Sequence, residues 1–259
     1  MSNNYIETPS FYNNEEYFKK YLGQTSYYTN LQSIVKKIVS LIKPDNVLEL
    51  GAALGTTSIQ LAKEYPNVSF VGTDLREDVV VLAKEASSNI ENLSFFSEDM
   101  CKTVKKSLEK YDLIFLLYSF HHIEDPINKK EYFLKDCFKN MKEGSYLFIL
   151  ETFFPEELNS EKEEQAILDL WKIRAKEGYA STYWAALQRL NENGLAFAKE
   201  VALTSEKEEI EAGNHVYDRQ EEYLVKFSWL NDKAKETGFQ ALIAEPVNCL
   251  CESALLLKK

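Results

Sequence analysis

The stretch Asn46-Val-Leu-Glu-Leu-Gly-Ala-Ala-Leu-Gly55, followed by a helix-like segment and by Val68-Ser-Phe-Val-Gly-Thr-Asp74, decides the fold of this chain. An apolar strand leads into a turn with two glycines, a helix follows, and a second apolar strand ends on a carboxylate. That carboxylate stands about 20 residues beyond the turn, the spacing at which an acid at a strand end reaches a ribose. The stretch therefore predicts a nucleotide-binding unit.

The turn and the acid suit opposite parts of one ligand. Gly51 and Gly55 can adopt backbone angles closed to other residues, and without a Cβ they let a ligand lie against the main chain. A hydroxyl side chain among residues 56–58 is expected to cap the following helix, whose positive dipole end faces the ligand. Asp74 then offers two acceptor oxygens to a pair of sugar hydroxyls.

The glycine pattern distinguishes between kinds of nucleotide. Nicotinamide and flavin proteins use G-x-G-x-x-G, and this turn does not meet that fingerprint. Glu49-Leu-Gly51-Ala-Ala53-Leu-Gly55 instead resembles motif I of the class I S-adenosylmethionine (SAM) dependent methyltransferases, an acid two positions before G-x-G-x-G. Ala53 stands where that family has its middle glycine. The resemblance implies SAM as the cofactor.

Three further segments extend the resemblance in the same order along the chain. Leu93-Ser-Phe-Phe-Ser-Glu-Asp99-Met100 resembles the third strand and the acid that faces the adenine amino group. Residues 111–126, with His121-His122-Ile-Glu-Asp125-Pro126, resemble the fourth strand and the His-His stretch of small-molecule methyltransferases. Residues 142–151 resemble the fifth strand and its preceding glycine turn. The match covers residues 44–151 well and the final segment moderately.

The resemblance also implies which residues hold the cofactor. The methionine portion is expected at the glycine turn and at the end of the fourth strand, the ribose at the acid that ends the second strand, and the adenine beyond the third. An aromatic residue of the N-terminal segment is expected to close over the cofactor. The expected cofactor-binding residues are Glu49, Gly51, Gly55, Asp74, Leu75, Asp99, Met100, Leu117, Tyr118 and Tyr28.

Methyl transfer asks for few catalytic groups, because the sulfonium is already activated and a base is needed only for a protonated nucleophile. His121 and His122 follow the fourth strand, where methyl group and acceptor meet, and imidazole titrates near neutral pH. Either could be the base, and either could be structural. His215 is a weaker candidate. We predict no metal site, because the aspartate followed by an Asp-Asn pair of metal-assisted methyltransferases is absent.

The remaining pattern predicts an α/β fold, a Rossmann-like seven-stranded, mostly parallel sheet with helices on both faces. Strands are expected at 46–50, 68–73, 93–97, 113–118, 145–150, 240–245 and 253–257. Helices are expected at 14–22, 31–42, 57–65, 77–89, 102–109, 127–141 and 219–237. We divide the chain into an N-terminal helical lid (1–43), a SAM-binding core (44–152), a helical insertion (153–217) and a closing helix with a β-hairpin (218–259).

The insertion is rich in large aromatic residues, which suggests a pocket for a mid-sized, partly apolar molecule, although aromatic residues at helical spacing are more often core. These aromatic residues are Phe153, Phe154, Trp171, Tyr179, Tyr183, Trp184, Phe197 and Tyr217.

The chain carries 41 acidic and 30 basic side chains, a formal charge of −11, which opposes nucleic acid as a partner. The sequence shows no membrane span or secretory signal, so we expect a cytoplasmic protein. We expect it to be a monomer or a homodimer. Its four cysteines are expected to be free thiols.

The sequence thus predicts a SAM-dependent methyltransferase acting on O or N of a small, partly apolar metabolite. Alternatives are a SAM-using enzyme of another reaction type and a non-catalytic SAM-binding protein. An RNA methyltransferase and a nicotinamide-dependent oxidoreductase are disfavoured by the acidic charge and by the turn sequence, respectively.

Overall fold

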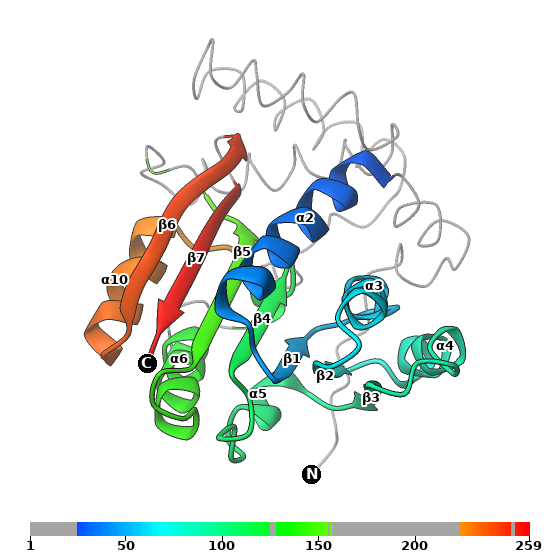
Figure 1. Cartoon of the computed structure of the whole chain (residues 1–259). Coiled ribbons are helices and arrows are strands. Elements are labelled where there is room, and N and C mark those ends of the chain that lie inside the picture. Colours follow the sequence, from blue (N-terminus) through cyan, green and yellow to red (C-terminus); the bar gives the residue numbers. More distant parts are fainter. Residues whose placement is uncertain (1–24, 125–127, 155, 157–222, 250–251) are drawn as a thin grey trace, which may run out of the picture. The chain divides into compact units, whose positions relative to one another are not determined.

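Seven short strands form one sheet, shown in Figure 1. They are β1 (Asn46–Leu50), β2 (Ser69–Asp74), β3 (Leu93–Ser97), β4 (Leu113–Leu117), β5 (Tyr146–Thr152), β6 (Gln240–Cys249) and β7 (Glu252–Lys258). Their spatial order is β3-β2-β1-β4-β5-β7-β6. The first five run parallel, whereas β7 is antiparallel to both of its neighbours. The predicted seven-stranded, mostly parallel sheet is confirmed.

The computed structural model describes residues 25–124, 128–154, 156, 223–249 and 252–259. Val35–Glu156 and Tyr223–Lys259 form one compact unit, which contains the whole sheet. Most of the predicted lid and of the helical insertion lies outside the described residues, so the four predicted domain boundaries stay predictions. Within the described ranges, no helix is both long enough and apolar enough to cross a membrane.

Helices cover both faces of the sheet (Figure 1). They are α2 (Thr25–Ile42), α3 (Thr56–Glu64), α4 (Glu77–Ala86), α5 (Met100–Thr103), α6 (Asn128–Asn140) and α10 (Phe227–Thr237), with a 3-10 turn η1 (Phe120–His122). α3 and α4 contact β2 and β3, and α10 contacts α6 and β6. Helices on both faces explain why the inner strands are largely buried and mostly apolar.

The helix predicted at 102–109 is wrong in extent, because α5 covers only Met100–Thr103. The Asp99 side chain starts it early by accepting a hydrogen bond from the Cys101 amide at 2.7 Å. At the other end of α5, the side-chain amide of Asn140 donates to the carbonyl of Val104, the C-cap residue, at 2.8 Å. These caps lie outside the local apolar pattern from which the range was predicted.

The start of α10 also differs from the prediction. Residues 223–226 are not helical, and the helix begins at Phe227 rather than near residue 219. Lys226 instead forms a parallel bridge with Phe154. Glu156 then holds the first turn, because its carboxylate accepts the Ser228 amide at 2.8 Å and the Ser228 hydroxyl at 2.6 Å. The end at Gly238, in the left-handed conformation, is as predicted.

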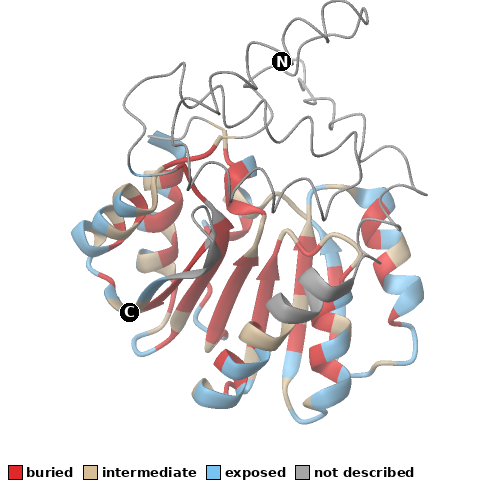
Figure 2. Cartoon of the chain, turned by 90° about the horizontal axis from the view of Figure 1, so that it is seen from above, coloured by how far each residue is buried: buried red, intermediate tan, exposed pale blue. Residues whose placement is uncertain are grey.

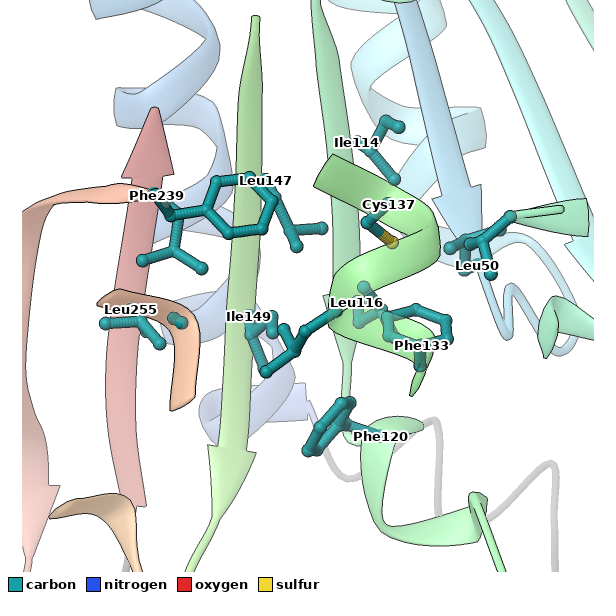
Figure 3. Packing of buried hydrophobic residues seen from close by; sticks show 14 of the residues in the cluster. Leu50, Ile114, Leu116, Phe120, Phe133, Cys137, Leu147, Ile149, Phe239 and Leu255 are labelled. Atoms are coloured by element: carbon teal, nitrogen blue, oxygen red, sulfur yellow. The ribbon is translucent and has the colours of Figure 1, made fainter. Parts of the chain in front are cut away.

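The core lies where strands and helices meet, and Figure 2 shows buried residues along the strands and exposed residues on the outer helix faces. Figure 3 shows its packing around Leu116, Ile149 and Phe133. Phe120 of η1 belongs to this cluster and packs edge-to-face on Phe133, with ring centroids 5.8 Å apart. Burying such a side chain is worth about 1.5–3 kcal/mol. Phe120 therefore anchors η1 and holds the residue that follows it.

The strand order contains a switch point between β1 and β4. The chain moves outward from β1 to β2 and β3, then returns to continue through β4 and β5 on the other side. The reversal falls between β1 and β4, which pair in parallel through Val47 with Leu113 and Glu49 with Phe115. In open α/β sheets, ligands bind beyond the carboxyl ends of the strands at such a switch point.

Candidate active site

The glycine turn after β1 is held against the end of β2. The amides of Gly51 and Ala52 both donate to the Thr73 carbonyl at 2.8 Å, and the Gly55 amide donates to Ala52 at 2.7 Å. Gly51 (φ 76°), Ala53 (φ 48°) and Gly55 (φ 70°) are all left-handed. Ala53, at the position of the family's middle glycine, thus adopts a conformation that alanine rarely takes.

Both glycines allow a close approach that a side chain would prevent. A Cβ on Gly51 would lie 2.4 Å from the Ser119 Cβ, and a Cβ on Gly55 would lie 2.2 Å from Cζ of Phe95. The turn after β1 therefore packs directly on the residues that follow β4 and on β3. Met100 lies at the same turn, its Cε 3.6 Å from that position on Gly51.

The expected hydroxyl cap of the next helix is wrong. Gly55 is the N-cap of α3, and no side chain caps it. Ser58 instead donates its hydroxyl to the Glu49 carboxylate, inside the protein. Glu49 is 4% exposed and Ser58 is fully buried. The amides of the first turn of α3 thus carry no side-chain cap, which leaves the positive end of the helix dipole beside the glycine turn.

Asp74 ends β2, as predicted, and both of its carboxylate oxygens are fixed. One accepts the Ala53 amide at 2.8 Å and the other accepts the Arg76 amide at 3.0 Å. Burial raises the pKa of Asp74, although those two amides act against the increase. Each oxygen can accept a second hydrogen bond, so the geometry suits two hydroxyls. Leu75 follows and is 63% exposed, an apolar surface beside the acid.

Asp99 caps α5 through one oxygen, as described above, so this acid has a structural partner in addition to its predicted role. Leu117 ends β4, and Tyr118 follows in a left-handed conformation with φ 48°. The Tyr118 amide donates to the Leu150 carbonyl at 2.9 Å. The Ser119 hydroxyl donates to the Leu50 carbonyl at 2.8 Å, which ties the end of β4 to the end of β1.

The two candidate histidines differ sharply. His121 is 6% exposed, and its Nδ1 lies 2.9 Å from one carboxylate oxygen of Glu151. The other oxygen of Glu151 accepts the His121 amide at 3.2 Å. The His121 carbonyl accepts the Tyr223 amide at 2.9 Å, so the residue is fixed on both sides. His122 is exposed, and its ring centroid lies 4.0 Å from that of His121.

Sequence reasoning missed Ser119, and it paired neither Ser58 with Glu49 nor Glu151 with His121. The signal for Glu151 was an acid at the carboxyl end of the apolar fifth strand. The predicted Tyr28 lies in α2, with its side chain outside the described part, and His215 lies outside the described residues. Across the described ranges, no group of three His, Cys, Asp or Glu side chains is placed to hold a metal ion.

Two of the insertion's aromatic residues are core rather than pocket. Phe153 is 2% exposed and Phe154 is 4% exposed. Phe153 packs edge-to-face on Phe227 of α10, with centroids 5.1 Å apart. The other six aromatic residues of that prediction lie outside the described residues.

Glu49 makes the stability of the protein depend on pH. Burial raises the pKa of this carboxyl from 4.5 to about 8, while the hydrogen bond from Ser58 opposes the increase. Between the two values the folded state holds a proton that the unfolded state has lost, so the free energy of unfolding falls as pH rises. Between about pH 5.5 and about pH 7.5 we expect a loss of about 2 kcal/mol.

Urea denaturation of the wild-type protein and of Glu49→Gln at several pH values measures this loss. The variant keeps the size of the side chain and cannot ionise, so its pH dependence over the same range should be weaker. Parallel curves for the two proteins would show that Glu49 does not titrate as described.

Comparisons with known proteins identify the family and the fold of the chain. A family model described as a methyltransferase domain matches residues 42–220. The carboxy-S-adenosyl-L-methionine synthase of Campylobacter fetus is 28% identical over 174 residues, 64% of this chain and 70% of that protein. The malonyl-[acyl-carrier protein] O-methyltransferase of Bacillus cereus is 29% identical over 120 residues, 46% of this chain and 42% of that protein. The structure of the SAM-dependent methyltransferase SibL in its apo form has a TM-score of 0.60 and 12% identity, covering 95% of this chain and 58% of that one.

The chain therefore spans less than two thirds of the Bacillus and SibL proteins. The chemistry of the site fits SAM. The start of α3 has no side-chain cap and offers amides, and Asp74 offers two acceptor oxygens beside the exposed Leu75. From the family match and the seven-stranded fold, the chain belongs to the class I SAM-dependent methyltransferases and uses SAM as its cofactor.

Proposed function

We propose that the protein transfers a methyl group from SAM to an oxygen or nitrogen atom of a small, partly apolar metabolite. SAM supplies a methyl group that is already activated by positive sulfur. The observation that carries the proposal is the buried pair of His121 and Glu151 at the carboxyl ends of β4 and β5. Ser119, which packs against the glycine turn, stands two residues before this histidine.

His121 is the general base in this proposal. Its Nδ1 faces a carboxylate oxygen, so the tautomer with the proton on Nδ1 is favoured and Nε2 becomes the basic nitrogen. A hydroxyl or amine loses a proton when it accepts a methyl group, and Nε2 takes that proton. Glu151 orients the ring through Nδ1 and stabilises the imidazolium that forms, as a carboxylate does in other base–orienter pairs. His122 is exposed, which favours His121 between the two.

The cofactor contacts in this proposal are those that the resemblance of the sequence motifs implies. Glu49 and Gly51, with the main chain of Leu117 and Tyr118, hold the methionine portion. Asp74 holds the ribose hydroxyls with the lone pairs that its two amide donors leave available. The adenine lies among the remaining predicted side chains, Leu75, Asp99 and Met100.

A second candidate is a reaction that changes SAM itself. The Campylobacter relative, which aligns with 64% of this chain, is a carboxy-S-adenosyl-L-methionine synthase. In that case the methyl carbon of SAM loses a proton and forms a carbon–carbon bond to carbon dioxide released from a carboxylic acid donor, so the product is a heavier carboxylated sulfonium rather than a methylated metabolite. The His121–Glu151 pair is compatible with both reactions, because each of them releases a proton, and the identity of the product distinguishes them.

The test is a transfer assay with methyl-labelled SAM and a panel of hydroxylated and aminated aromatic and aliphatic metabolites. We expect label in a small product, with S-adenosylhomocysteine released in equal amount. Asp74→Asn is the matched control. Its side-chain NH₂ group would face the backbone N–H of Ala53 or of Arg76, donor against donor. This change should weaken cofactor binding by about 1–3 kcal/mol. A heavier sulfonium formed without any methylated product would replace the first candidate by the second.

A further inference from the structure

The main chain of His121 is bonded on both sides by residues that are distant in the sequence. Its amide donates to the Glu151 carboxylate at 3.2 Å, and its carbonyl accepts the Tyr223 amide at 2.9 Å. These two groups belong to the rigid peptide planes on either side of the Cα atom. Fixing both planes fixes the direction of the Cα–Cβ bond, which aims the imidazole ring. The position of the ring therefore depends on Tyr223 as well as on Glu151.

Tyr223 supplies a bond that the short turn η1 does not make itself. The Ile123 amide closes this turn on the Phe120 carbonyl at 3.2 Å. The last carbonyls of any helix have no partner inside that helix. At His121 the partner is the amide of Tyr223, which opens the non-helical segment 223–226 before α10.

Segment 223–226 runs beside the chain that leaves β5. The Phe154 amide donates to the Val225 carbonyl at 3.0 Å, which joins the two segments just beyond the site. Glu151 lies at the end of the same strand, before Phe154. Both partners of the histidine thus belong to segments that are bonded to each other, and the bonds form a closed loop.

Apolar burial presses segment 223–226 against the core without setting its register. Leu224 and Val225 are both buried. Hydrophobic burial is non-directional, whereas a hydrogen bond requires that donor and acceptor be aligned. A single backbone bond such as that of Phe154 is weak in net terms. A stronger directional contact is needed to place the amides of this segment.

Glu156 provides that contact. Its carboxylate accepts the amide of Ser228 at 2.8 Å and the hydroxyl of the same residue at 2.6 Å. Its backbone carbonyl accepts the ammonium of Lys226 at 3.0 Å. Hydrogen bonds to an ionised acceptor are stronger than neutral ones, and two bonds to one residue fix its orientation. Glu156 therefore joins the chain that follows β5 to the start of α10.

The start of α10 depends on this contact because it has no cap of its own. Lys226 is the N-cap residue, and its side chain makes no cap hydrogen bond. Helices are usually capped by Ser, Thr, Asp or Asn at this position. Here the acceptor comes from Glu156, on the other chain segment. One carboxylate thus sets both the start of α10 and the place of segment 223–226 beside β5.

We propose that Glu156 is a positioning residue for His121: by binding Ser228 it sets the register at which Tyr223 meets the His121 carbonyl. This proposal rests on the proposed role of His121 as the base. Glu156 is exposed and acts through the main chain. A reacting group displaced by about 1 Å can lose about 10²-fold in rate, so a carboxylate outside the site can control the chemistry.

A set of variants separates the two effects of Glu156. Glu156→Ala removes both the cap of α10 and the connection to segment 223–226. Lys226→Ser, added to it, restores a cap from the N-cap position without restoring the connection, and Lys226→Ser alone is the reference for the loss of the ammonium. Glu236→Ala is the matched control, because it removes an exposed carboxylate of the same helix, paired with Lys233 at 2.7 Å.

Hydrogen exchange of the Tyr223 amide, measured by NMR in the full chain, reports its bond to His121. In Glu156→Ala we expect this amide to exchange about tenfold faster, the factor that corresponds to one hydrogen bond. Exchange of the β4 amides corrects for any loss of global stability. In the double variant, the Leu230 amide, which bonds the Lys226 carbonyl at 3.2 Å, should be protected again while Tyr223 still exchanges fast.

Two further readouts report the effect on the histidine. The kcat of Glu156→Ala for methyl transfer should fall by about 10- to 100-fold, while the KM for SAM stays within about twofold. The ¹⁵N signals of the His121 ring, assigned with His121→Asn, should move in Glu156→Ala and stay unchanged in Glu236→Ala. The ring signals need no acceptor substrate.

Corrected Tyr223 exchange within about twofold of the wild-type rate in Glu156→Ala, or restored by Lys226→Ser, would overturn the proposal, because Glu156 would then only cap a helix. An unchanged kcat beside a fast Tyr223 amide would overturn it as well. If the wild-type protein methylates no acceptor, the proposed function fails, and the ring signals of His121 decide the positioning role. If Glu156→Ala does not fold, Glu156→Gln, which keeps one acceptor oxygen, decides through the same measurements.

Discussion

Replacing His121 by Asn should lower the rate of methyl transfer by about 10²- to 10⁴-fold, the usual contribution of a positioned general base. Asn keeps a polar side chain that can donate to Glu151 but cannot accept a proton at neutral pH. The affinity for S-adenosylhomocysteine should be nearly unchanged, because the proposed cofactor contacts do not include His121. Single-turnover kinetics with the identified acceptor, together with calorimetric titration of S-adenosylhomocysteine, measure the two effects separately.

His122→Asn is the matched control for this result. The ring of His122 is exposed and lies beside that of His121, so its removal should change turnover much less. The turnover of Glu151→Gln should fall between those of the two histidine variants. The side chain of Gln has only one acceptor oxygen, whereas His121 presents two donors, its backbone N–H and Nδ1–H. Equal losses in His121→Asn and His122→Asn would contradict the assignment of the base to His121.

Replacing Gly55 by Ala should destabilise the protein by about 2–5 kcal/mol and weaken the binding of S-adenosylhomocysteine. Two costs add. The left-handed backbone at φ 70° disfavours a Cβ by about 1–2 kcal/mol. The Cβ would also lie 2.2 Å from the Phe95 ring, and such overpacking costs about 1–3 kcal/mol. Urea denaturation and calorimetric titration measure the two effects.

Gly144→Ala separates these costs. Gly144 is also left-handed, with φ 78°, but a Cβ there would meet nothing within 4 Å. Gly144→Ala should therefore lose only about 1–2 kcal/mol of stability, which is the backbone cost, and should bind the cofactor as the wild-type protein does. Phe95→Leu added to Gly55→Ala should recover part of the lost stability by making room for the Cβ. If both glycine variants lose the same stability, packing against Phe95 is not what requires Gly55.

Much of the core follows from local pattern. Residues 46–50 include three apolar residues before a glycine turn, and β1 has the predicted bounds. Asp74 ends β2 as the spacing from the turn predicted. The prediction of residues 102–109 as helix was wrong, because Asn140 and Asp99 set the limits of α5 and Asn140 is distant in the sequence. The start of α10 was wrong for the same reason, since Glu156 holds its first turn.

In the candidate site, too, local sequence predicted some features, and contacts between distant residues decided others. Residue types and spacing identified the glycine turn, the acid after β2 and the two histidines after β4, because each depends on residues close in the chain. Spacing could not choose between His121 and His122, since neighbours in a sequence share every local signal. Their difference comes from Glu151, thirty residues further along the chain, which reaches His121 only because β4 and β5 pair in parallel.

The sequence by itself determined the first strands of the sheet, the glycine turn and the acid that ends β2, because these features depend on local backbone geometry. Only the tertiary structure decided that His121 is buried against a carboxylate, that Ser58 bonds Glu49 instead of capping a helix, and that Glu156 caps α10 from another segment. These contacts join separate elements, and their energies depend on burial, which exists only after the sheet and its helices have come together.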